Sequence, residues 1–157
     1  MSTAVRSDVA FATESFEAIF TEGSQLLANH WVEIAHYKDI PLDIDVERYR
    51  AMEAAGMLRV FTARLEGRLI GYAVFVVNRN SHYRSSVQAV QDVLYVDPHE
   101  RRGLTGLKLV KFADEVLRVE EVQVVYHHVK AKHPILGRLL GRLGYEVVDV
   151  IYAKRLD

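Results

Sequence analysis

The hydrophobic pattern of the first third of the chain is helical. Between residues 15 and 37 apolar side chains recur every three or four positions, at Phe16, Ile19, Phe20, Leu26, Leu27, Trp31 and Ile34. This spacing is typical of one face of an α-helix. Gly23 is a candidate break between two helices, and Asp45 is a candidate N-cap for a further helix ending near Gly56. A short strand over residues 9–13 is a candidate first element.

The period changes to that of β-strands in the middle of the chain. Residues 58–65 and 69–77 are rich in β-forming side chains and are separated by the turn sequence Glu66-Gly67-Arg68. This arrangement favours a hairpin. A polar loop over residues 78–86 leads to a third strand over residues 87–96. Three consecutive strands predict an antiparallel meander.

The last third alternates between helix and strand. We expect helices over residues 105–119 and 135–143, and strands over 122–129 and 147–153. The full order of elements predicts an α+β (mixed α/β) fold in which a mostly antiparallel central sheet carries helices on both faces.

Composition narrows the class of protein. A chain of 157 residues, 50% of them apolar, has the usual size of one domain, so we expect a single domain over residues 1–157 with a flexible arm over residues 1–8. The 20 basic and 21 acidic residues leave a formal net charge of −1, which argues against nucleic acid or an anionic membrane as the main partner. The absence of cysteine excludes disulfides, thiolate metal sites and a thiol nucleophile. No secretory signal or long apolar run is evident, so we expect a cytoplasmic location.

One segment combines features of an anion-binding site. The sequence over residues 94–109, LYVDPHERRGLTGLKL, reads as a strand that ends near Pro98, a basic glycine-containing turn and the start of a helix. Free N–H groups at a helix start bind phosphate, and small residues let a ligand approach the backbone. Arg101, Arg102 and Lys108 add positive charge. The segment therefore predicts a pyrophosphate or other anion site, with an ordinary strand-to-helix connection as the alternative.

The same segment resembles a motif of the GNAT acyltransferases. Their motif runs Arg or Gln, two residues, Gly, one residue, Gly or Ala, and here Arg101 takes the first position and Gly106 the last. Leu104 stands where the first glycine is usual, and Gly103 lies one position earlier. The resemblance implies acetyl-CoA or another acyl-CoA as donor, and no metal. The residues it implies for binding the donor are Leu94, Tyr95, Val96, Arg101, Arg102, Gly103, Leu104, Thr105 and Gly106.

A second feature supports this resemblance. Leu139-Leu-Gly-Arg-Leu-Gly144-Tyr145-Glu146 is similar to the short helix and Gly-aromatic step before the last strands of GNAT proteins. Gly144 is expected to end the helix and Tyr145 to start the next strand. More narrowly, His30-Trp31, Gly71-Tyr72, His82-Tyr83 and the terminal Tyr152-Ala-Lys154-Arg-Leu156 resemble a bacteriophage-encoded GNAT subgroup.

The resemblance implies direct transfer of an acetyl group to an amine, which requires a base, an oxyanion donor and an acid. Asp92 is the first candidate base, because it lies on the strand that leads into the motif, and burial beside Tyr72 or Tyr95 would tune it. A solvent-facing Asp92 is the alternative, and His82 and His30 are rival bases. The backbone N–H groups of residues 94–96 are the oxyanion donors that the resemblance implies.

The position of the family's usual acid tyrosine is occupied by Leu140, which cannot donate a proton. Tyr126 is our candidate replacement, and Tyr145 and Tyr152 are alternatives. Because the thiolate of CoA is a good leaving group, the family tolerates loss of this acid.

Other polar groups have simpler interpretations. His30, Glu33 and Tyr37 share one helical face and suit the polar rim of an acceptor pocket, whereas the histidines at 30 and 36 do not share a face and argue against a metal site. Likewise His127 and His128 point to opposite sides of a strand. A basic C-terminal set fits either a solvated surface or a second phosphate contact; it consists of Lys130, Lys132, His133, Arg138 and Arg142.

The sequence favours two alternative functions. The first is an N-acetyltransferase that uses acetyl-CoA and an amine of a small molecule or protein. The sequence leaves the oligomeric state open, with a homodimer as one alternative. The second is a non-catalytic GNAT-fold binding or structural protein, which the departures at Leu104 and Leu140 favour. No motif for nucleic-acid recognition is evident.

Overall fold

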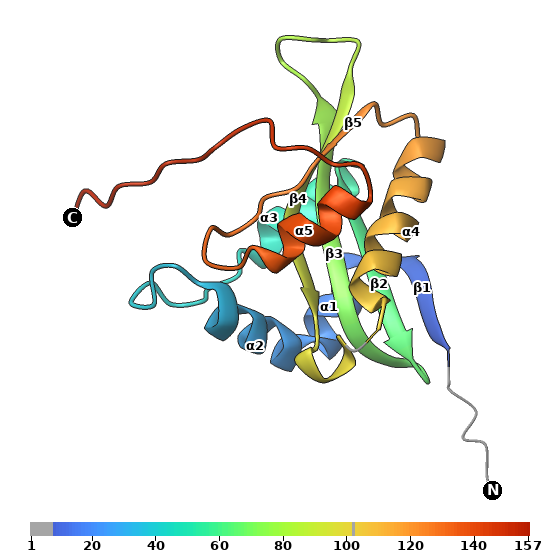
Figure 1. Cartoon of the computed structure of the whole chain (residues 1–157), viewed down its shortest axis with the longest axis vertical. Helices are drawn as coiled ribbons and strands as arrows, with labels where there is room; N and C mark the ends of the chain where they lie inside the picture. The colour runs from blue at the N-terminus through green and yellow to red at the C-terminus, as the bar shows by residue number, and fades with distance from the viewer. Residues whose placement is uncertain (1–7, 102) are drawn as a thin grey trace, which may run out of the picture.

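The computed structural model describes residues 8–101 and 103–157 (Figure 1). The elements follow the order β1 (Val9–Glu14), α1 (Phe16–Glu22), α2 (Ser24–Ile34), α3 (Val46–Ala54), β2 (Leu58–Leu65), β3 (Arg68–Arg79), β4 (Val87–Val96), the 3-10 turn η1 (Pro98–Glu100), α4 (Thr105–Val119), β5 (Val124–Tyr126) and α5 (Ile135–Arg142). The predicted first strand, the break at Gly23 and the three-strand meander are confirmed. Arg102 lies outside the described residues.

Local sequence signals act where they were expected. The carboxylate of Asp45 accepts a hydrogen bond from the Arg48 backbone N–H at 3.0 Å and so caps α3. The β2–β3 turn places Glu66 and Gly67 at φ values of 51° and 81°, the left-handed pair that a two-residue hairpin requires. Gly144, at φ 87°, follows the end of α5 as predicted.

The five strands form one sheet in the order β1-β2-β3-β4-β5. The first four strands pair antiparallel, and β5 pairs parallel with β4. The predicted mostly antiparallel sheet is therefore confirmed.

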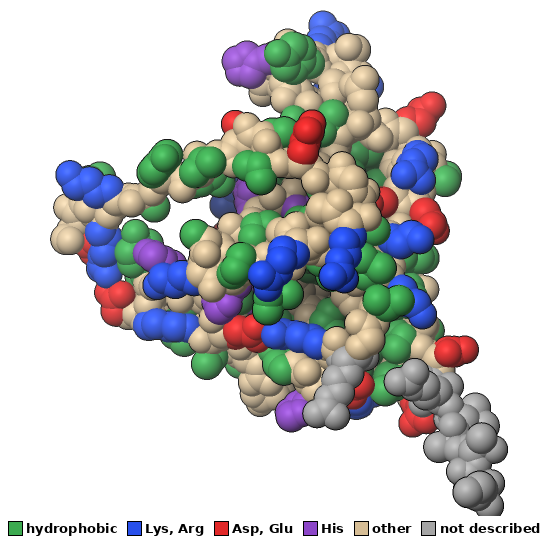
Figure 2. All heavy atoms as spheres, viewed as in Figure 1, with side chains coloured by type: hydrophobic (Ala, Val, Ile, Leu, Met, Phe, Trp, Pro, Cys, Tyr) green, Lys and Arg blue, Asp and Glu red, His purple; other side chains and the backbone are tan. Residues whose placement is uncertain are grey.

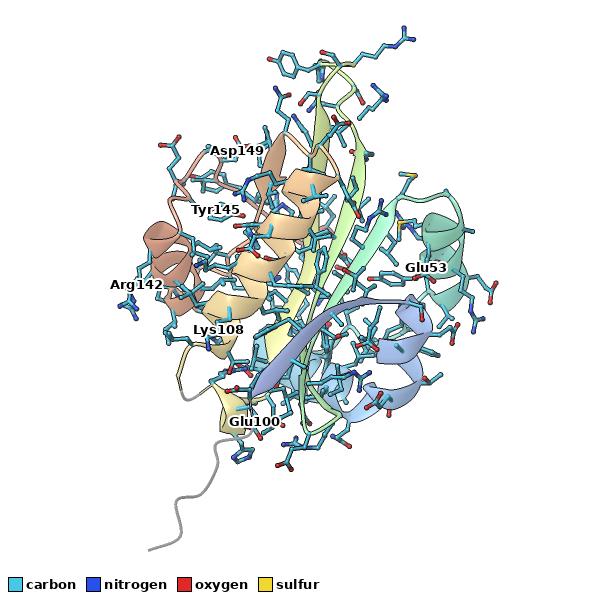
Figure 3. All side chains as sticks on the ribbon, turned by 90° about the vertical axis from the view of Figure 1, so that its right-hand side faces the viewer. Glu53, Glu100, Lys108, Arg142, Tyr145 and Asp149 are labelled. Atoms are coloured by element: carbon cyan, nitrogen blue, oxygen red, sulfur yellow. The ribbon has the colours of Figure 1, made fainter. Side chains whose placement is uncertain are left out.

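Helices cover both faces of this sheet, as Figure 3 shows edge-on. On one face the fully buried Leu109, Ala113 and Leu117 of α4 pack against the strand residues Phe61 and Phe75. The opposite face carries a second core, formed by Phe16, Ile19 and Leu26 of α1 and α2 with Leu58, Val60, Leu69, Tyr72, Val74 and Tyr95 of the strands. Apolar burial on both faces explains why the central strands are hydrophobic at nearly every position.

The C-terminal end differs from the prediction. The strand expected over residues 122–129 is confined to Val124–Tyr126, and residues 147–153 form no strand at all. They run out as an exposed tail, visible in Figure 1 and, with its apolar side chains, in Figure 2. β-Forming residues become a strand only where a neighbouring edge pairs with them, and residues 147–153 pair with no strand. Within the described residues, no helix is both long and apolar enough to span a bilayer.

Candidate functional site

The candidate site lies where β4 and β5 separate. β5 pairs with β4 only from Gln88–Val124 to Val90–Tyr126. β4 continues to Val96, so in the described part of the chain its next six residues have no strand partner on the β5 side. Such an edge presents backbone N–H and C=O groups to a ligand that carries amides of its own.

An irregularity in β4 lies at the start of this open edge. Val74 pairs with Val93 and Phe75 pairs with Gln91, so Asp92 is an extra residue on β4 with no partner on β3. A bulge of this kind redirects a side chain out of the regular alternation. Asp92 is exposed, and its carboxylate accepts a hydrogen bond from the Tyr49 hydroxyl. The burial beside Tyr72 or Tyr95 that we expected is not found.

His30 occupies the position between those two tyrosines instead. Its Nδ1 shares a hydrogen bond of 2.9 Å with the Tyr72 hydroxyl, and its ring stacks on Tyr95 with centroids 4.6 Å apart. Burial lowers the pKa of His30 to about 4, and the nearby charges of Arg101 and Lys130 act in the same direction while Glu33 opposes them. The imidazole is therefore neutral near pH 7 and is a weak base.

Arg101 links the loop after β4 to helix α2. Its Nη1 and Nη2 donate to the two carboxylate oxygens of Glu33 at 2.8 and 2.7 Å, and its Nε donates to the Val96 carbonyl at 2.8 Å. The guanidinium also lies 5.2 Å from the centre of the Tyr95 ring. A phosphate that bound Arg101 would have to compete with Glu33. The pairing also gives Glu33 a role that the predicted polar rim did not specify.

The start of α4 has the features of an anion site. Its N-cap residue, Leu104, is exposed and provides no side-chain hydrogen bond to the first N–H groups. Gly103 adopts a φ of 102°, which glycine reaches without strain, and an added Cβ at Gly106 would touch only the Leu139 side chain, at 3.6 Å. Within the described residues, the first N–H groups of this 15-residue helix therefore have no side-chain cap, and such groups bind anions. Lys108 is exposed one turn further along α4, and Figure 3 shows it on the same side of the sheet as Arg142 of α5.

The other two predicted catalytic residues, Tyr126 and His82, lie at different places relative to the open edge of β4. Tyr126 is half-buried at the end of β5, opposite Val90, close to the point of separation. His82 is exposed in the β3–β4 loop, at the far end of β4 from the η1 turn (Figure 1). The structure therefore does not bring His82 to the open edge of β4.

The remaining tyrosines are not placed as free acids. Tyr145 donates to Asp114 Oδ1 at 2.5 Å, and burial with this hydrogen bond raises its pKa. Tyr152 is 92% exposed in the tail. Leu140, at the position where the resemblance implied an acid tyrosine, is buried within α5.

Sequence reasoning missed Tyr49 and the pair formed by Gln91 and His127. His127 Nδ1 donates to Gln91 Oε1 at 2.7 Å just beyond the last β4–β5 pair, and its ring meets Phe75 and Tyr145 edge-on. Burial lowers the pKa of His127 to about 4, so the ring is neutral near pH 7. No local pattern reveals these contacts, because Tyr49 and Asp92 lie 43 positions apart and Gln91 and His127 lie 36 apart.

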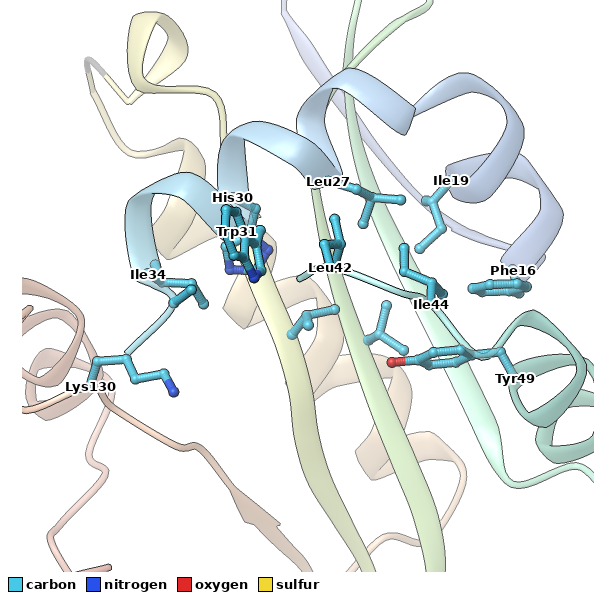
Figure 4. A pocket seen from close by; sticks show the side chains of 13 residues that line it. Phe16, Ile19, Leu27, His30, Trp31, Ile34, Leu42, Ile44, Tyr49 and Lys130 are labelled. Carbon is cyan, nitrogen blue, oxygen red and sulfur yellow. The ribbon is translucent and has the colours of Figure 1, made fainter. Parts of the chain in front are cut away.

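An apolar cavity of about 190 Å³ lies next to Asp92, on the face of the sheet covered by α1 and α2 (Figure 4). It is bounded by those helices, by α3, by the segment over residues 35–44, by Val74 and Val93 of the sheet and by Lys130. No group of three or more His, Cys, Asp or Glu side chains suitable for a metal ion occurs among the described residues.

Comparison with solved structures identifies the fold. The chain is similar to an aminoglycoside acetyltransferase from an uncultured soil metagenomic sample, with 16% identity, a TM-score of 0.74, and coverage of 95% of this chain and 97% of that one. It is similar to a ribosomal-protein-alanine N-acetyltransferase from Brucella melitensis biovar Abortus 2308, with 14% identity, a TM-score of 0.73 and coverage of 96% and 100%. It is also similar to AAC(6')-Iy in complex with the bisubstrate analog CoA-S-monomethyl-acetylneamine, with 17% identity, a TM-score of 0.70 and coverage of 95% and 99%.

No protein-family model matches the sequence, and no curated protein matches it significantly. The structural likeness extends over 95% or more of the chain. The chain therefore has the GNAT fold that the sequence motif predicts.

Proposed function

We propose that this protein is an N-acetyltransferase that moves an acetyl group from acetyl-CoA to an amine. One observation carries the proposal: a GNAT-fold sheet whose β4 edge is open beyond Val90 leads through the η1 turn to the N-terminus of α4, where the N-cap residue Leu104 provides no side-chain cap. An open strand edge and an open helix start are complementary to the two polar parts of CoA, the amide-containing pantetheine and the pyrophosphate. The acetyltransferase structures to which the chain is similar support the same assignment.

The residues present fit this donor. The backbone of residues 94–96 would pair with the pantetheine amides, and the N–H groups at residues 104–106 would bind the pyrophosphate, with Lys108 nearby. Arg101 would contribute charge only after leaving Glu33, so we assign it first to holding the loop against α2. When bound, acetyl-CoA supplies an activated acetyl group.

The acetyl group passes directly from sulfur to nitrogen, without a covalent enzyme intermediate. The amine nitrogen attacks the thioester carbonyl, a C–N bond forms, the C–S bond breaks, and its electron pair leaves with sulfur. Asp92 takes the proton that the amine loses, because its exposed carboxylate lies on the β4 bulge where the open edge begins. Backbone N–H groups of residues 94–96 stabilise the charge that develops on the carbonyl oxygen.

The leaving thiolate does not require a dedicated acid. A thiol has a pKa of about 8.5, so its anion leaves readily near neutral pH. Tyr126 pairs with Val90, the last residue of β4 that has a partner on β5, so Tyr126 lies at the start of the open edge. We retain it as the candidate that protonates the thiolate.

The second candidate function is a GNAT-fold protein that binds without transferring. Leu140 in place of the usual acid, Leu104 in place of the usual glycine and the engagement of Arg101 by Glu33 favour it. Catalysis with the proposed residues would contradict it.

The test combines binding and turnover. Calorimetric titration should show saturable binding of acetyl-CoA to the wild type and loss of binding in Gly106→Trp, whose bulky side chain would cover the α4 N-terminus. With an amine that is a substrate, Asp92→Asn should lower kcat by about 10² to 10⁴-fold, whereas Tyr49→Phe, which removes only the donor to Asp92, should lower it far less. Absence of acetyl-CoA binding by folded wild-type protein would make the non-catalytic function the leading one.

Finer assignments remain proposals. We propose a homodimer, for which the exposed apolar side chains of Val147, Val148, Val150 and Ile151 on the tail provide the argument. A cytoplasmic location and membership of a phage-encoded subgroup stay predictions of the sequence. Sedimentation of the full chain, compared with a chain truncated after Tyr145, tests the dimer.

A further inference from the structure

The apolar cavity beside Asp92 has the size of a small hydrophobic group. Its volume of about 190 Å³ exceeds the roughly 150 Å³ of an engineered protein cavity that binds benzene. The walls include Phe16, Leu27, Trp31, Ile44, Val74 and Val93. Figure 4 shows Phe16, Leu27 and Trp31 of α1 and α2 and Ile44 of the following segment around this space. An aromatic ring or a branched alkyl group fits such a space.

The charges around the cavity narrow the class of ligand further. Lys130 is the one charged side chain among the described residues that line it, and Figure 4 places Lys130 beside Ile34 at one end of the cavity. His30 is neutral, because burial lowers its pKa to about 4, and its Nδ1 is engaged by Tyr72. None of the described residues that line the cavity is a carboxylate, so none of them neutralises an additional ammonium group.

The cavity is connected to the proposed base through two of its lining residues. Tyr49 lines the cavity and donates its hydroxyl hydrogen to Asp92, and Val93, which follows Asp92 on β4, lines it as well. Asp92 therefore lies one hydrogen bond away from one side chain of the cavity wall and next in sequence to another.

We propose that the acceptor is a monoamine with an apolar body about the size of an aromatic ring. This inference rests on the proposed function and narrows its acceptor class. The apolar body occupies the cavity, the single amine faces Asp92, and Lys130 disfavours any second positive charge. Polyamines and other polycationic amines are poor acceptors.

A matched series of para-substituted benzylamines tests the charge rule. Release of CoA thiol is measured with benzylamine, p-xylylenediamine and 4-(aminomethyl)benzoate, which share the ring and differ in the charge of the para group. We expect kcat/KM for the diamine to be about two- to fivefold below that for benzylamine, the scale of one partly exposed charge interaction. Equal or faster turnover of the diamine or of spermidine by the wild type would overturn the inference.

Charge reversal at Lys130 provides the decisive variant. Lys130→Glu should raise the ratio of kcat/KM for p-xylylenediamine over benzylamine and lower the ratio for the benzoate. Lys132→Glu, an exposed lysine that does not line the cavity, is the matched control and should leave both ratios at their wild-type values. Ratios that shift equally in the two variants would assign the effect to overall charge and contradict a role for Lys130.

Occupancy of the cavity is measurable without catalysis. Trp31, the single tryptophan of the chain, lines the cavity, so its fluorescence should change saturably on titration with benzylamine. Ala35→Phe, which adds volume to a lining position, should abolish that change. Leu42→Ala, at a lining residue that is 46% exposed, serves as a second variant and should improve kcat/KM for 1-naphthylmethylamine relative to benzylamine.

The outcomes separate this inference from the proposed function. Turnover of polycationic amines with no response of Trp31 to benzylamine would overturn the acceptor class and leave the acetyltransferase intact. A saturable Trp31 response lost in Ala35→Phe, with no acetyl-CoA binding, would support the cavity's ligand class and defeat the acetyltransferase.

Discussion

The two halves of the sheet are built differently. β3 and β4 pair continuously from Gly71–Val96 to Arg79–Val87, interrupted only by the bulge at Asp92, and helices bury both faces of this region. β5 pairs with β4 at three positions only, and the chain after α5 forms no strand. The first region is therefore a rigid frame, and the second leaves backbone groups and apolar side chains without partners.

This difference shows where a ligand can be accommodated in a small sheet protein. A fully paired strand has no free backbone groups, whereas an edge that loses its neighbour halfway offers a row of them next to a fixed core. The candidate site lies at that boundary. Tyr95 belongs to the frame by its packing, whereas Asp92 on the bulge and Arg101 in the loop after β4 are exposed and are held by Tyr49 and Glu33.

The largest expected effect separates the frame from the tail. Leu109→Ala removes a fully buried side chain between α4 and the sheet and should lower the free energy of unfolding by about 2 to 5 kcal/mol. Ile151→Ala, at a tail residue that is 73% exposed, should change it by less than about 0.5 kcal/mol. Urea denaturation measures both. A comparable loss in Ile151→Ala would mean that the tail packs against the protein or a second copy in solution.

A somewhat smaller effect on the free energy of unfolding is expected from the protonation of His30, in the core beneath α2. Because the folded-state pKa of His30, about 4, lies below its ordinary value of 6.5, the unfolded chain binds the proton more tightly. Stability should therefore fall as the pH drops from 6.5 to 4, by on the order of 2 to 3 kcal/mol from this residue.

The variant His30→Phe keeps an aromatic ring against Tyr95 and removes the titration, so its free energy of unfolding should depend less on pH in that window. His82→Phe, in the exposed β3–β4 loop, is the control and should retain the wild-type dependence. An unchanged pH profile in His30→Phe would show that the ring is not buried as described.

The smallest expected effect concerns the link between frame and site. Glu33 and Arg101 are 31% and 42% exposed, so a double-mutant cycle with Glu33→Gln and Arg101→Ala should give a coupling of about 0.2 to 1 kcal/mol. Glu33→Gln should also tighten acetyl-CoA binding about two- to threefold, since a freed guanidinium can approach the pyrophosphate. The exposed pair Glu47 and Arg50 provides the control cycle, for which no change in acetyl-CoA binding is expected. Weaker binding in Glu33→Gln would assign the pair to shaping the loop alone.

The sequence predicted most of the frame because its signals are local. Periodicity located the helices and the meander, Asp45 and Gly144 marked helix ends, and Glu66-Gly67 marked the hairpin. The prediction of a strand over residues 147–153 was wrong for the same reason: the pattern reports β-forming side chains but not whether an edge is available to pair with them.

The candidate site was predictable only in part. The residue types of the motif over residues 101–106 were evident in the sequence. The N-terminus of α4, where Leu104 provides no side-chain cap, agrees with the anion site that the motif predicted. The exposure of Asp92 agrees with one of the two alternatives that the sequence left open. Its contact with Tyr49 and the engagement of Arg101 by Glu33 were not predictable, since each joins elements far apart in the chain.

The sequence by itself determined the order of elements, the α+β class and the basic glycine-containing turn that carries the family resemblance. Tertiary structure decided which carboxylate lies on the bulge, which histidine is buried neutral and where β5 stops pairing. The physical reason is range: hydrophobic periodicity and turn chemistry act over a few residues, whereas burial, charge pairing and strand-edge availability depend on surfaces brought together from the whole chain.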